Sequence, residues 1–253
     1  MDISILIFAF LAAVAGGFIN AIAGGGTLVT FPVLLALGIS PLAANITNTI
    51  ALCPGYISGA FAQRKDFQSQ KQKLWKILPV SILGGVIGGF LLLNTGESLF
   101  RMLIPYLILI ATCILAIQVP VKKWIINRTK LSGSEKINDI LMLLMIFPSA
   151  IYGGYFGAGL GVILMAVLGL VINESLNKIN ALKQAISFSI NFFAAIYFSF
   201  SGKADWIIAF VMAIGAISGG IIGGKLASKI KQEIFRWIIV IIGLAVAIYY
   251  FIK

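Results

Sequence analysis

The chain contains no histidine, and it has only two cysteines and eight acidic residues. Without histidine it lacks the side chain whose pKa lies closest to neutrality, which argues against histidine-based catalysis and proton relay. Cys53 and Cys113 both fall inside apolar runs, with no metal-ligand spacing, so neither a zinc site nor a disulfide framework is expected. We therefore expect no metal and no cofactor.

Charged residues are scarce, at 11% of the 253 residues, against roughly 25% in an ordinary soluble domain. Apolar residues make up 60%, and long runs carry no charge: 3–63, 77–96, 102–121, 140–173, 184–202, 206–224 and 237–252. Most runs have the roughly 20 residues that a helix needs to cross a bilayer. They are apolar on every side, which favours helices over alternating barrel strands. The sequence predicts an all-α, polytopic integral membrane protein.

The second half of the chain repeats the first at an offset of 135 residues. The clearest match is Gly84–Gly89 against Gly219–Gly224, and Asn45 meets Asn180 at the same offset. Self-similarity at a fixed offset is the signature of an internal duplication. The predicted division is a first membrane repeat at 1–121, a basic linker at 122–137 and a second membrane repeat at 138–253.

Each half contains the same series of apolar elements. They cover about 3–23, 27–38, 41–62, 75–95 and 99–119, then 138–156, 160–172, 175–201, 205–224 and 233–252. The second element of each half is too short to span, and it follows a glycine cluster, where a helix breaks most readily. The pattern predicts about eight spanning helices and two short half-helices or re-entrant segments.

Basic residues between the apolar elements indicate how the halves are oriented. In the first half they gather after the third element, at 64–76, and in the second half after the fourth element, at 225–236. The positive-inside rule then puts equivalent loops on opposite sides of the membrane, as in an inverted repeat. The linker would be cytoplasmic and both termini external. The alternative is that these clusters of basic residues are distributed along the chain by chance. In either case the net charge of +11 is a topology signal rather than a nucleic-acid-binding face.

The two glycine breaks are the first candidates for a binding site. Unwound backbone at membrane depth is tolerated only inside the protein or along a polar cavity. Free N–H groups and the positive dipole end of a helix starting near Thr27 would favour an anion. The alternative for any one of these glycines is close helix packing, which we prefer for Gly84–Gly89 and Gly219–Gly224. The candidate residues are Gly24, Gly25, Gly26 and Thr27 in the first half, and Gly157, Gly159 and Gly161 in the second.

Further candidates lie on the third element of each half, where helical spacing puts polar residues on one face. They are Thr47, Asn48 and Thr49 in the first half, and Asn180, Lys183, Gln184 and Ser187 in the second. Two such faces suggest one central cavity lined by both halves. A charge about two turns into a membrane helix is costly unless it faces water or a partner. Lys183 therefore either binds an anion or snorkels to the interface, as we expect of Lys178.

The segment Gly16–Pro32, with its run Gly24-Gly25-Gly26-Thr27, resembles the first segment of the TauE/SafE (sulfite exporter, TSUP) family. Gly38–Thr49 is similar to that family's turn and Thr-Asn element, and Gly153–Gly161 to its repeated glycine motif. A further stretch, Ser201–Trp206, resembles its Ser-Gly-x-x-x-Trp loop. The resemblance implies a permease of the bacterial or archaeal plasma membrane for sulfite, sulfonates or related organosulfur anions.

Asn20 completes the candidate substrate-binding residues. It stands where similar sequences frequently have an acidic residue, and Tyr155, near the equivalent place in the second half, is not acidic either. If that carboxylate couples protons in relatives, the resemblance does not carry such coupling over to this chain.

Our functional hypothesis is a transporter that moves a small anion by alternating access around a midplane site. A passive anion channel and a non-transport membrane scaffold remain alternatives. An enzyme is not expected, because the sequence has no cysteine paired with a base and no paired carboxylates deep in an apolar run. The expected partners are the lipid bilayer and a small-molecule anion, with no nucleic acid. The glycine pattern is compatible with a homo-oligomer.

Overall fold

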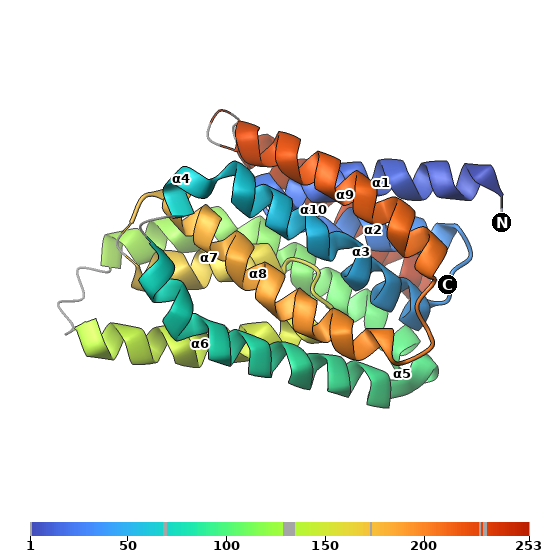
Figure 1. Cartoon of the computed structure of the whole chain (residues 1–253), viewed down its shortest axis with the longest axis horizontal. Coiled ribbons are helices and arrows are strands. Elements are labelled where there is room, and N and C mark those ends of the chain that lie inside the picture. The colour runs from blue at the N-terminus through green and yellow to red at the C-terminus, as the bar shows by residue number, and fades with distance from the viewer. Residues whose placement is uncertain are drawn as a thin grey trace.

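The computed structural model describes residues 2–67, 70–128, 135–172, 174–227, 229 and 232–252. Every regular element in these residues is a helix (Figure 1). The helices are α1 (Ile3–Ile22), α2 (Thr27–Ala36), α3 (Pro41–Ala62), α4 (Arg64–Phe67), α5 (Lys71–Arg128), α6 (Glu135–Tyr155), α7 (Leu160–Val171), α8 (Leu176–Ser199), α9 (Trp206–Leu226) and α10 (Gln232–Ile252). By length and composition α1, α5, α8 and α9 can each cross a membrane. The prediction of an all-α polytopic membrane protein is confirmed.

Helix α5 consists of two helices that meet at Gly96. The backbone of Gly96 has φ 73° and ψ 165°, a conformation that only glycine adopts readily. The two parts match the elements expected at 75–95 and 99–119. The next residue, Glu97, accepts hydrogen bonds from the Leu42 backbone N–H and the Ser40 hydroxyl, both at 3.4 Å. The bend in α5 thereby holds the start of α3.

Helices α2 and α7 are the short elements predicted after the glycine clusters. They have 10 and 12 residues, which at about 1.5 Å per residue is roughly half the hydrocarbon thickness. Gly24 and Gly25 precede α2 with φ 83° and 96°, and Gly157 and Gly159 precede α7 with φ 73°. Side chains other than glycine rarely tolerate these angles, so the breaks are encoded locally.

Each half of the chain packs its helices against the other half. Helices α1 and α3 pack on α9, whereas α6 and α8 pack on α5. In the same reciprocal way α2 contacts α10, and α7 contacts α5. Helices α3 and α8 contact each other directly. The third elements of the two halves, which carry most of the predicted polar site residues, are therefore neighbours.

The glycine clusters on α5 and α9 are the surfaces on which this packing takes place. A Cβ built on Gly85 would lie 2.6 Å from the carbonyl oxygen of Ile190 in α8. A Cβ built on Gly220 would lie 2.5 Å from the carbonyl oxygen of Gly55 in α3. Gly85 and Gly220 are 135 positions apart, and so are Gly55 and Ile190. The preferred packing role of these clusters agrees with the structure, and the contacts follow the offset of the predicted duplication.

The two chain ends lie at the same end of the helix bundle, away from α4 (Figure 1). This arrangement is compatible with termini on one side of the membrane, as predicted. Helix α5 extends to Arg128 and α6 begins at Glu135. The linker expected at 122–137 is thus helical at both ends, and its central part, 129–134, lies outside the described residues.

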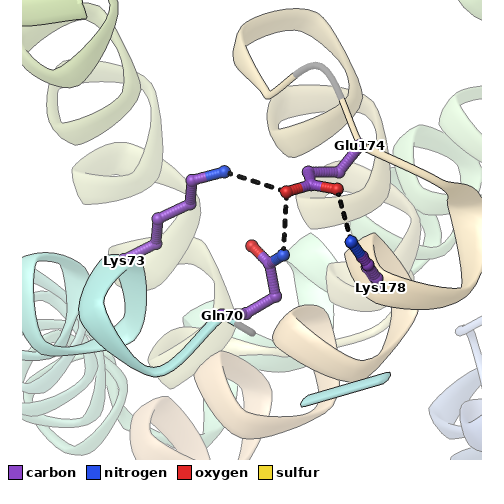
Figure 2. Close-up of polar contacts among 4 residues, drawn as sticks. All are labelled: Gln70, Lys73, Glu174 and Lys178. Atoms are coloured by element: carbon purple, nitrogen blue, oxygen red, sulfur yellow. Dashed lines mark hydrogen bonds and ion pairs between the residues drawn. The ribbon is translucent and has the colours of Figure 1, made fainter. Parts of the chain in front are cut away.

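Glu174, between α7 and α8, links three segments of the chain (Figure 2). Its carboxylate accepts hydrogen bonds from Lys178 Nζ at 3.0 Å and from Gln70 Nε2 at 3.1 Å, and Lys73 Nζ lies 3.6 Å away. The hydrogen bond from Lys178, followed by that from Gln70, lowers the pKa of Glu174 below its usual value. The carboxylate therefore remains ionised and ties the start of α5 to the start of α8.

The packing role of Gly85 against Ile190 can be tested by adding a single methyl group. Gly85→Ala places a Cβ against the Ile190 carbonyl, so we expect a loss of about 1–3 kcal/mol in unfolding free energy. Gly169→Ala in α7 is the matched control, because a Cβ there meets open space. It should be neutral or stabilising, since alanine favours a helix over glycine. Thermal unfolding in detergent measures both, and equal shifts would contradict the packing role.

The Glu174 cluster predicts a pH-dependent stability. Because its folded-state pKa is lowered, its contribution is complete above the unfolded value of about 4.3 and is lost as pH falls through the folded value. Glu174→Gln should lower the unfolding temperature slightly at pH 7 and flatten its decline between about pH 5 and 3. Asp2→Asn at the exposed N-terminus should leave the profile unchanged. An unaltered profile for Glu174→Gln would show that the cluster does not stabilise the fold.

Candidate functional site

The glycine break that precedes α2 lies against the first turn of α7. A Cβ on Gly24 would lie 2.9 Å from the Cα of Gly161, and a Cβ on Gly161 would lie 2.9 Å from the Cα of Gly24. The two backbones therefore touch without space for a side chain. We call this contact between Gly24 and Gly161 the glycine junction. It joins the interrupted parts of the two halves into one place in the structure.

The side chain of Lys183 extends from α8 to the glycine junction. It is fully buried, at 0% exposure, and its Cδ lies 3.5 Å from the Cβ position of Gly161. Its ammonium Nζ donates to the backbone carbonyl of Asn20 in α1 at 2.9 Å. The snorkelling alternative for Lys183 is therefore wrong. Lys178 behaves as expected, because its ammonium is partly exposed beside Glu174.

Among the residues that the structure describes, no carboxylate forms an ion pair with Lys183. The ion pairs in the described part of the chain involve other cations. Partial compensation comes from Asn20, whose carbonyl belongs to the last turn of α1, the negative end of the helix dipole. An ammonium has three N–H donors, and the hydrogen bond to the Asn20 carbonyl uses one of them. The site thus combines a fully buried lysine amine, which has no carboxylate partner among the described residues, with spare N–H donors, an arrangement that favours an anion.

Asn20 caps the start of α2 from inside the protein. Its Oδ1 accepts from the Gly26 backbone N–H at 2.7 Å, and its Nδ2 donates to the Tyr56 hydroxyl at 3.3 Å. The prediction that the Gly26 N–H is free for an anion is therefore wrong. The carboxamide oxygen of Asn20 fills that position because α1 ends close to the start of α2.

Two equivalent asparagines cap the first helix of the opposite half. Asn180 Nδ2 donates to the carbonyl of Ala21 at 2.9 Å, and Asn45 Nδ2 donates to the carbonyl of Tyr155 at 2.9 Å. Asn180 Nδ2 also donates to Gln63 Oε1 at 2.8 Å. Gln63 was not a predicted site residue. Its only signal in the sequence is a polar side chain between the apolar third element and the basic loop.

Gln184 and Ser187 are buried polar side chains with unmet hydrogen-bonding groups. Both are 0% exposed, and Gln184 Oε1, Gln184 Nε2 and Ser187 Oγ have no hydrogen-bond partner among the described residues. Each such group costs about 1–3 kcal/mol, so several in one place call for an explanation. They lie beside and one turn beyond Lys183 on α8, and Gln184 packs over Gly59 of α3. They are therefore candidates to contact a ligand near Lys183.

Asn48 and Thr27 form a buried polar pair in the first half. Asn48 Nδ2 donates to Thr27 Oγ1 at 3.3 Å, and Asn48 Oδ1 is buried without a partner among the described residues. Asn48 is 135 residues before Lys183 and Thr27 directly follows the first glycine break. The structure therefore brings these two predicted residues together at the start of α2.

The remaining predicted site residues have partners that serve the fold. Thr47 Oγ1 accepts from the Asp205 backbone N–H at the start of α9, at 3.0 Å, and Thr49 Oγ1 donates to the carbonyl of Asn45 in its own helix, at 2.9 Å. Thr47 thus points to a different element from Asn48. Gly159 packs against Ala111, with 3.4 Å between its Cβ position and the nearest atom. Gly25 and Gly157 also have positive φ angles that the breaks require.

The sequence was compared with known proteins. The family described as "Sulfite exporter TauE/SafE" matches residues 9–250. A "Probable membrane transporter protein" of Haemophilus influenzae is 28% identical over 249 residues, covering 96% of this chain and 94% of the relative. The "Probable membrane transporter protein YfcA" of Escherichia coli strain K12 is 28% identical over 240 residues, covering 92% and 85%.

A third relative, the "Probable membrane transporter protein ORF9" of a Sinorhizobium species, is 27% identical over 246 residues and covers 96% of this chain and 91% of its own. No solved structure matches the chain. The family match extends over nearly all of the sequence and includes both glycine breaks and Lys183. The chain therefore belongs to the TauE/SafE sulfite exporter family and is a multi-pass transporter of the cell membrane.

Proposed function

We propose that this transporter carries a small oxoanion, sulfite or a related sulfonate, and that Lys183 is the cation that binds it. The observation that carries the proposal is the complete burial of the Lys183 ammonium without a carboxylate partner in the described residues. A buried charge at membrane depth is expensive to retain unless it has a function. An anion that enters this site supplies the missing opposite charge.

The hydrogen-bonding groups around Lys183 suit an oxoanion. A sulfite or sulfonate presents several acceptor oxygens and no strong donor, so it requires donors from the protein. Lys183 has spare N–H groups, the Gln184 amide has two N–H donors, and the Ser187 hydroxyl has one. Charge-assisted hydrogen bonds from an ammonium are about twice as strong as neutral ones. Lys183 would therefore supply most of the affinity, and Gln184 and Ser187 the orientation.

The choice of a sulfur oxoanion rests on the family. The family description names sulfite export, and the relatives from Haemophilus influenzae and Escherichia coli are named only as probable transporters. The site itself selects for charge and for acceptor oxygens rather than for sulfur. We therefore regard sulfite, sulfonates and thiosulfate as the first substrates to test, with sulfate as a related oxoanion.

Alternating access around this site is supported by the reciprocal packing of the two halves. Helix α9 carries the glycine contacts for α1 and α3, and α5 carries those for α6 and α8. Small residues at these contacts let the backbones of membrane helices approach each other closely. In the proposed mechanism the two inverted repeats exchange conformations, and the anion competes with the Asn20 carbonyl for the Lys183 ammonium.

The proposal predicts a large difference between two lysines on the same helix. Lys183→Gln removes the buried charge and should reduce anion counterflow into proteoliposomes by about 10- to 100-fold. Lys178→Gln removes a partly exposed charge and should change it by less than about twofold. The panel contains sulfite, sulfate, thiosulfate and short sulfonates.

Equal effects of the two substitutions would remove Lys183 from the binding site. Absence of counterflow for every member of the panel, from protein that remains folded, would contradict the sulfur-anion substrate. A unitary conductance without saturable counterflow would instead identify a channel, and it would contradict the alternating-access mechanism.

A further inference from the structure

A polar pocket of about 290 Å³ opens beside the end of α3. Its lining includes Gln63, Lys65, Asp66, Asn177 and Lys225. Lys65 and Lys225 are far apart in the sequence and belong to the two basic segments that the positive-inside rule assigns to the cytoplasm. Their meeting at one pocket agrees with both segments facing the same side. Two lysines and one aspartate give the pocket a net positive lining.

Helix α8 leads from this pocket to Lys183. Asn177 lines the pocket and is exposed, Asn180 is 2% exposed one turn later, and Lys183 is fully buried one turn beyond. Each of these residues lies three positions after the one before, so successive members are neighbours on the helix surface, in a row that turns about 120° around α8. The polar face of α8 therefore extends from the surface of the protein to the buried ammonium.

The bond between Gln63 and Asn180 lies between the pocket and Lys183. Gln63 lines the pocket and is only 7% exposed, and its Oε1 accepts from Asn180 Nδ2 at 2.8 Å. Asn180 donates in turn to the carbonyl of Ala21, next to the Asn20 carbonyl that binds Lys183. The Gln63–Asn180 hydrogen bond therefore connects the pocket lining to the end of α1 that holds Lys183.

We propose that this pocket is the cytoplasmic entrance for the transported anion, and that the Gln63–Asn180 hydrogen bond closes it. The proposal rests on the function proposed for Lys183. Lys65 and Lys225 raise the local concentration of anions through their charge. Gln63 is a positioning residue, because it holds Asn180 against the end of α1 and does not itself touch Lys183 in this conformation.

Cysteine accessibility tests the barrier independently of transport. In a background with Cys53 and Cys113 replaced by alanine, Ser187→Cys provides a single thiol beyond Lys183. Inside-out vesicles are treated with a membrane-impermeant methanethiosulfonate that carries a sulfonate. Adding Gln63→Ala should raise the rate of labelling by about tenfold, the effect of losing one hydrogen bond from a closed conformation.

Gln63→Glu is the matched control, because its carboxylate is the same length and can still accept the bond from Asn180. It should give no increase in labelling. Size-exclusion profiles and unfolding temperatures identify any variant that fails to fold. Labelling of Gln63→Ala that equals labelling of the parent would overturn the barrier, and so would an equal increase in Gln63→Glu.

The charge of the entrance is tested by comparing the anionic reagent with a trimethylammonium reagent of similar size. In the Gln63→Ala protein, Lys65→Gln with Lys225→Gln should lower the anionic-to-cationic rate ratio by about threefold or more. An unchanged ratio would contradict the entrance.

If labelling behaves as expected but no anion shows counterflow, the proposed function fails and the barrier stands. If Lys183→Gln abolishes counterflow but Gln63→Ala leaves labelling unchanged, the entrance alone fails.

Discussion

An ammonium group buried among membrane helices needs compensating dipoles or an opposite charge, and this requirement organises the centre of the protein. Lys183 reaches the carbonyl of Asn20 only because α1 ends beside α8. Asn180, one turn away, satisfies the neighbouring carbonyl of Ala21. The free carbonyls at the end of α1 are thus used by donors from the other half of the chain. These contacts compensate part of the lysine charge, and in the proposed function an anion compensates the remainder.

Glycine makes this arrangement sterically possible. At Gly24 and Gly161 the two interrupted segments approach until their backbones touch, and any side chain would separate them. On α5 and α9 the glycines let the helices of one half sit directly on carbonyl groups of the other half. The positive φ angles of Gly24, Gly25, Gly157 and Gly159 end each preceding segment before α2 or α7 begins. Binding site and helix packing therefore depend on the same residue type.

The sequence predicted the features that depend on local chemistry. The order of the elements, the short second helices and the breaks before Thr27 and Leu160 follow from apolar length and glycine, and the structure agrees. Features that depend on contacts between the two halves of the chain could not be predicted from the sequence. Lys183 does not snorkel because α8 lies close enough to α1 for its ammonium to reach the Asn20 carbonyl. The Gly26 N–H is bonded because Asn20, at the end of α1, lies next to it. Gln63 was missed because its partner, Asn180, is 117 positions away.

Equilibrium binding of radiolabelled sulfite to the purified protein in detergent tests the central claim most directly, because it measures the Lys183 site without requiring transport or coupling. We expect saturable binding to the wild type and to Lys178→Gln, displaced by unlabelled sulfonates. Binding should be at least about tenfold weaker for Lys183→Gln, since the charged hydrogen bond is lost. Equal affinity of Lys183→Gln and the wild type would contradict the assignment of the buried ammonium as the anion-binding group.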